Sequence, residues 1–105
     1  MKPIEKSQQN ASMAQERKEY AFVASVIFDS PSQKKWLSVR FPIEETQVGD
    51  KFRVAFRPKG TDEEWRQTVS TVYFERFKDG HILDIDMEFP GVNVDDEYDV
   101  IATKL

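Results

Sequence analysis

Apolar and polar side chains alternate along three segments of the chain, residues 36–43, 51–57 and 82–89. The apolar positions are Leu37, Val39, Phe41 and Ile43 in the first, Phe52, Val54 and Phe56 in the second, and Leu83, Ile85, Met87 and Phe89 in the third. A period of two places these side chains on one face of an extended strand. Each segment is therefore predicted to be a β-strand with one buried face.

Three further strands are predicted, at residues 20–28, 66–77 and 98–103, and the middle one is the longest of all. In residues 20–28, Val23 and Ile27 make the second face apolar as well, which predicts a strand that lies centrally or under a loop or helix. The pair Asp79-Gly80 predicts a tight hairpin between residues 66–77 and the strand at 81–89. Thr61 is expected to cap one helical turn over residues 61–65.

About six short strands with turn residues between them predict an all-β, antiparallel domain. With so few strands, a small, partly open β-barrel hides the strand edges best, and a two-layer β-sandwich is the second choice. We predict one β domain over residues 20–105 and a polar tail over residues 1–19. The tail is expected to be disordered or to form a short helix, for which Ser12 and Gln15 provide a capping box.

Composition narrows the class of protein. The chain has 105 residues, a net charge of −4 and no cysteine, which excludes disulfide scaffolds, thiolate metal sites and cysteine nucleophiles. The acidic balance argues against non-specific binding to duplex nucleic acid. We find no apolar run long enough for a signal sequence or a membrane span, so we expect a soluble, cytoplasmic protein with no membrane partner.

Catalytic chemistry has little support in the sequence. His81 is the only histidine and is expected to be exposed. No nucleophile motif surrounds any serine, so we expect His81 to be structural and not part of a catalytic triad. The four glycines stand alone in turns, so no phosphate-binding loop can be written. We assign no catalytic, cofactor-binding or metal-binding residue, and expect no cofactor.

Outward-facing charges are sorted by sign along the chain. A candidate binding face combines basic and aromatic residues of the early strands: Trp36, Arg40, Lys51, Arg53, Arg57 and Trp65. A candidate acidic face follows later in the chain: Asp84, Asp86, Glu88, Asp95 and Asp96. Calcium binding and carboxylate catalysis are conceivable on the acidic strand, but a solvated face that confers solubility is the favoured interpretation.

Two functions of different classes fit these features. The first is a non-catalytic interaction module that binds a protein partner or associates with a second copy of itself. The alternative is a single-stranded nucleic-acid-binding domain that uses the basic and aromatic face of residues 36–43 and 51–57, where cations meet phosphates and bases stack on rings. The sequence favours the first function.

Overall fold

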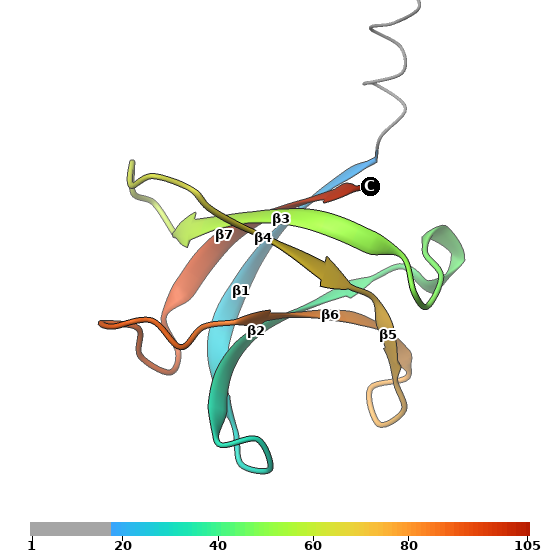
Figure 1. Ribbon diagram of the computed structural model, residues 1–105, viewed down its shortest axis with the longest axis horizontal. Coiled ribbons are helices and arrows are strands. Elements are labelled where there is room, and N and C mark those ends of the chain that lie inside the picture. Colours follow the sequence, from blue (N-terminus) through green and yellow to red (C-terminus); the bar gives the residue numbers. More distant parts are fainter. Residues whose placement is uncertain (1–17) are drawn as a thin grey trace, which may run out of the picture.

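The computed structural model describes residues 18–105 as an all-β domain (Figure 1). Its strands are β1 (Glu19–Asp29), β2 (Lys34–Phe41), β3 (Lys51–Pro58), β4 (Arg66–Thr71), β5 (Tyr73–Glu75), β6 (Gly80–Asp86) and β7 (Glu97–Lys104), with one 3-10 turn, η1 (Ile43–Glu45). The predicted all-β class is confirmed. The capping box at Ser12 and nearly all of the predicted tail lie outside the described residues.

Every strand pair is antiparallel, and the strands follow one another in the order β4-β3-β7-β1-β2-β6-β5. The sheet curls into an open half-barrel, which confirms the predicted partly open barrel (Figure 1). Strand β1 is central and serves both halves, because Glu19–Ser25 pair with β7 while Val26–Asp29 pair with β2. At the change of partner, the Val26 backbone exchanges 2.8 Å hydrogen bonds with Asp95 and Asp96.

The predicted long strand over residues 66–77 is wrong as a single element, since β4 and β5 lie at opposite edges of the sheet. The break is at Val72, which is buried. The Val72 N–H donates to the Asp50 carbonyl at 2.8 Å, and its carbonyl accepts from the Gly49 N–H at 2.9 Å. Because the Val72 N–H and C=O bond to the turn before β3, the chain bends at Val72. It leaves β3, its partner along β4, and goes on to pair with β6 along β5. This bend accounts for seven strands where about six were predicted.

The helical turn predicted at residues 61–65 is also wrong, since these residues form no regular secondary structure. Both the Thr61 N–H and the Thr61 hydroxyl donate to the Pro58 carbonyl, at 3.3 Å and 2.9 Å. Thr61 therefore closes a turn after β3 instead of capping a helix. The predicted hairpin before residue 81 is present, with β5 and β6 paired and Asp79 at a φ of 49° in the turn.

The core is formed by the inward faces of the strands, as the alternation predicts. Its largest fully buried side chains include Phe41, Phe52, Phe56, Leu37, Leu83, Ile85 and Met87. Phe41 and Phe52 stack with ring centroids 4.7 Å apart, and Tyr20 meets both rings edge-on. Ile43 departs from the prediction and is exposed, because β2 ends at Phe41 and Ile43 begins the η1 turn after Pro42.

Candidate functional site

The six basic and aromatic residues predicted as one face fall into two groups. Trp36 and Arg40 lie on β2, whereas Lys51, Arg53 and Arg57 lie on β3. Strands β7 and β1 lie between β3 and β2 in the sheet. Adjacent strands are about 4.8 Å apart, so three strand spacings separate the two groups by roughly 14 Å along a curved surface.

The β2 group holds two turns in place. The Trp36 indole N–H donates to the Ser32 hydroxyl at 3.0 Å, and the Lys34 ammonium lies 5.4 Å from the centre of the Trp36 ring. The Arg40 guanidinium donates to the Lys78 carbonyl in the turn between β5 and β6. These contacts give both side chains a structural use within the domain.

Two of the three β3 cations, Arg53 and Arg57, lie beside Trp65, which ends the loop before β4. Lys51 lies at the other end of β3, where it pairs with Thr71. The Arg57 guanidinium lies over the Trp65 ring, 4.2 Å from the ring centre, a geometry that favours cation–π attraction. Beneath them, Ala55 of β3, Ile101 of β7 and Ala21 of β1 form one row across the outer face of the sheet. We call the outer surface formed by Ala21, Val23, Ala55, Arg57, Trp65 and Ile101 the Trp65 face.

Two shallow hollows flank Trp65 on this face. One of about 360 Å³ is lined by residues that include Val23, Arg57 and Ile101, and one of about 230 Å³ by residues that include Arg53 and Ala55. The alanines leave room beside the half-buried indole, so its ring has apolar floor on both sides. The Arg57 Nε is buried and makes no hydrogen bond within the described part of the chain.

Strand β1 adds exposed apolar surface to the Trp65 face. Its outward side chain Val23 is 55% exposed, and Ile27 further along the strand is 40% exposed. The predicted central place of β1 is confirmed by its position fourth in the order of seven strands. Residues 18–105 cover these side chains only in part, so the second apolar face of this central strand stays partly in solvent.

The predicted acidic residues are tied into the fold by specific hydrogen bonds. Asp84 accepts from the Tyr73 hydroxyl at 2.6 Å and from the Ser38 hydroxyl, and Asp86 accepts from the Lys34 ammonium at 2.8 Å. The Lys34 contact lowers the pKa of Asp86 and raises that of Lys34. Glu88 has a backbone partner instead of a side-chain partner: its Oε2 accepts a hydrogen bond from the Lys35 N–H at 2.7 Å.

Asp95 and Asp96 belong to the loop that precedes β7. Their backbones bond to Val26, and the Asp96 carboxylate accepts the Asn93 N–H at 2.9 Å. Within residues 18–105, no three carboxylate or histidine side chains are arranged to hold a metal ion. The predicted acidic face is thus distributed between β6 with the residues that directly follow it and a separate loop before β7.

The Tyr73–Asp84 contact predicts a measurable effect of alkaline pH. Burial, followed by the hydrogen bond to Asp84, raises the pKa of Tyr73 well above its ordinary 10.0. Since the folded state holds this proton more tightly, the resulting stability is complete below about pH 10 and is lost as the pH rises further. We expect Tyr73→Phe to weaken this alkaline loss of stability, measured by urea unfolding at several pH values. An unchanged pH dependence would contradict the assignment.

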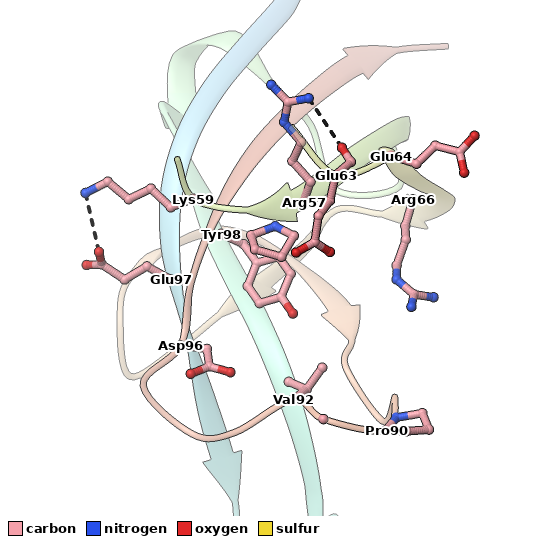
Figure 2. A pocket seen from close by; sticks show the side chains of 12 residues that line it. Arg57, Lys59, Glu63, Glu64, Arg66, Pro90, Val92, Asp96, Glu97 and Tyr98 are labelled. Carbon is pink, nitrogen blue, oxygen red and sulfur yellow. Dashed lines mark hydrogen bonds and ion pairs between the residues drawn. The ribbon is translucent and has the colours of Figure 1, made fainter. Parts of the chain in front are cut away.

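A third hollow, of about 420 Å³, lies at the end of the molecule between the loop after β3 and the loop before β7 (Figure 2). Lys59 and Glu97 pair across its rim at 3.3 Å, and the Arg57 Nη1 donates to the Glu63 carbonyl at 3.4 Å (Figure 2). Burial raises the pKa of the Tyr98 hydroxyl in its wall. The hollow is therefore polar and lined by both signs of charge.

Sequence reasoning missed Arg66, Phe89 and Tyr98 as possible site residues. The Arg66 guanidinium lies 4.3 Å from the centre of the Phe89 ring, and Phe89 lies 6.2 Å from Phe56. Arg66 begins β4 and Phe89 follows the end of β6, so their contact could be recognised only once β4 and β6 were known to face each other.

His81 was predicted to be exposed, and that prediction is wrong because the side chain is half-buried. Its Nδ1 shares a 2.8 Å hydrogen bond with the hydroxyl of the buried Thr46, and its ring meets Phe74 edge-on. The contacts fit a structural residue that links η1 to the β5–β6 hairpin.

Comparison with known proteins adds no relative to this geometry: no family model matches the chain, and no curated protein matches its sequence. Within the described residues, no helix has the length and hydropathy needed to cross a membrane.

Proposed function

We propose that this protein is a non-catalytic interaction module that binds a protein partner through the Trp65 face. The observation that carries the proposal is the Trp65 ring, which lies under the Arg57 guanidinium and between two apolar hollows. Tryptophan and arginine on an apolar floor are the residues that most often dominate protein–protein binding energy. The exposed Val23 beside them extends the apolar surface that a partner would cover.

The basic residues of β2 and β3 do not form one continuous patch, which favours a protein over a single-stranded nucleic acid as the partner. Single-strand binders combine a continuous basic groove with several stacking rings. Here Trp36 and Arg40 lie on a different strand and already form hydrogen bonds within the domain. Trp65 is therefore a single stacking ring beside Arg53 and Arg57. A cytosolic location, favoured by the cysteine-free sequence, completes the proposal.

Truncation of Trp65 is expected to weaken partner binding. The immobilised protein is used to capture proteins from a nuclease-treated cell extract, and each captured protein is then purified and titrated. We expect Trp65→Ala to raise its Kd about 30-fold, which corresponds to a hot-spot loss of about 2 kcal/mol. The control is Phe77→Ala, because the Phe77 side chain is 94% exposed in a remote turn.

Two results would count against the proposal. One is a captured protein that binds Trp65→Ala as tightly as the parent chain. The other is capture that occurs from an untreated extract and not from the nuclease-treated one, together with quenching of tryptophan fluorescence by oligonucleotides at low salt. That result would support the nucleic-acid alternative.

A further inference from the structure

Strands β4 and β6 face each other across the opening of the half-barrel without pairing. Figure 1 shows them close together near β5 and diverging toward the start of β4. The Ser70 hydroxyl donates to the Asp84 carbonyl at 2.8 Å where they approach, and no backbone hydrogen bond joins β4 to β6 within residues 18–105. Where they diverge, a hollow of about 430 Å³ lies between them, which we call the seam.

The direction of the β4 backbone groups follows from the pairing of β3. The Lys51 carbonyl accepts the Leu105 N–H at 2.9 Å, so Lys51 bonds away from β4, toward the β7 side. Bonding direction alternates along an antiparallel strand, so Phe52 and Val54 bond to β4, where their partners are Ser70 and Thr68.

The residues between those partners direct their backbone groups the other way. Gln67 and Val69 thus turn their N–H and C=O groups into the seam. On the opposite lip, the Met87 N–H donates to the Lys35 carbonyl at 3.0 Å, so the backbone of Asp86 likewise faces the seam. The Ser70–Asp84 bond agrees with this alternation, because it reaches the Asp84 carbonyl from the β4 side.

The side chains around the seam give it a definite chemical character. Its floor contains the Phe56 and Phe89 rings, and Arg66 covers Phe89 at the wide end. The β6 lip carries Asp86 and Glu88. Asp86 is paired with Lys34, whereas Glu88 forms no ion pair with any residue in the described part of the chain.

The edge of β4 has little of the usual protection against pairing. Native edge strands are commonly blocked by proline, by charged side chains such as lysine, or by a covering loop. Arg66–Val69 are all exposed, include no proline, and carry one charge, at Arg66, where the strand begins. The opposite edge of the sheet differs, because β5 is only three residues long.

We propose that the free edge of β4 binds an extended segment of a partner protein by strand addition. The segment pairs with the backbone of Gln67 and Val69, places an apolar side chain over Phe56 and Phe89, and places a lysine or arginine beside Glu88. Four exposed residues at about 3.3 Å each give an edge of roughly 13 Å, which suits a segment of about four to six residues. This inference rests on the proposed function in that the ligand is a protein.

The test uses a phage-displayed library of random hexapeptides selected against the full chain. The best peptide is synthesised and its Kd is measured with the parent protein, Gln67→Pro and Gln67→Ala. Proline at residue 67 removes an N–H that β3 does not use, so the fold should persist while the added strand loses a hydrogen bond and meets the proline ring. We expect Gln67→Pro to weaken binding about tenfold and Gln67→Ala to leave it unchanged.

A second variant tests the charge of the lip. We expect the selected peptides to carry lysine or arginine. Glu88→Lys should weaken the binding of these peptides. The control Glu63→Lys, in the hollow at the end of the molecule, should leave their binding unchanged. Circular dichroism and melting temperature verify that each variant is folded. Protection of the Gln67 and Val69 amide protons from exchange in the complex would locate the peptide on β4.

Three outcomes would overturn the inference: no hexapeptide is selected, the peptide binds Gln67→Pro as tightly as the parent, or the parent is a dimer that Gln67→Pro converts to monomer. The last would make a second copy of this chain the occupant of the edge. The proposed function is separable from these outcomes, because Trp65→Ala is expected to weaken the captured partner and leave the hexapeptide bound. Loss of only one of the two effects identifies which proposal fails.

Discussion

Replacement of Phe52 by alanine is expected to lower the free energy of unfolding by about 3–5 kcal/mol, the range for truncating a large buried aromatic side chain. Phe52 is fully buried on β3, stacks on Phe41 and meets Tyr20 at 5.9 Å. Alanine would leave a cavity beside the rings of Tyr20 on β1 and Phe41 on β2. Because small domains are stable by only about 5–15 kcal/mol in total, this one change removes a large part of the stability.

The measurement is urea or guanidinium unfolding, followed by circular dichroism and tryptophan fluorescence. The matched control is Phe77→Ala, which deletes the same side chain from a position that is 94% exposed and should change stability by no more than about 0.5 kcal/mol. Equal losses in the two variants would show that Phe52 is not in the core, and the order of the strands would then need revision.

Much of the fold is predictable from the sequence because burial on a strand repeats every second residue. The alternation in residues 51–57 correctly placed Phe52, Val54 and Phe56 inside and Lys51, Arg53 and Arg57 outside. The same rule placed Leu37, Val39 and Phe41 of β2 and Leu83 and Ile85 of β6 inside. It failed beyond the ends of these strands, where Ile43 is exposed and Phe89 is only half-buried. The preference for closing a small sheet on itself predicted the half-barrel. These are local patterns or general constraints, so a single sequence contains them.

The bend at Val72 could not be predicted in this way. Residues 66–77 are rich in β-branched and aromatic side chains, so local preference extends one strand through the whole segment. The bend is caused by two hydrogen bonds with residues far away in the sequence: the Val72 N–H donates to the Asp50 carbonyl, and the Val72 carbonyl accepts from the Gly49 N–H. Contacts of this kind depend on tertiary structure and leave no periodic signal.

The candidate site shows the same division between local and distant information. The sequence shows that the charges are sorted by strand, but it does not show the order of the strands in the sheet. In the structure the C-terminal strand β7 lies between β3 and β1. This order separates Trp36 and Arg40 from the β3 cations. It also supplies Ile101 as the apolar floor beneath Trp65, a residue that no pattern around Trp65 could indicate.

Replacement of Val72 by proline is expected to lower the free energy of unfolding by about 2–4 kcal/mol. Proline has no N–H, so the Asp50 carbonyl would lose its 2.8 Å partner at a buried site, and the pyrrolidine ring would disturb the packing of Val72. The substitution should destabilise the whole barrel, because at Val72 the chain connects one edge of the sheet to the other.

Thr71→Pro provides the matched control one residue away. Thr71 is exposed, and the alternation along β4 directs its N–H away from β3, so proline there removes no ladder hydrogen bond. Denaturant unfolding should show a clearly smaller loss for Thr71→Pro than for Val72→Pro, and amide exchange should show faster exchange of the Gly49 N–H in Val72→Pro alone. The reverse order of stabilities would mean that β4 bonds to β3 through its odd-numbered residues, and the free edge assigned to Gln67 and Val69 would then belong to Arg66 and Thr68.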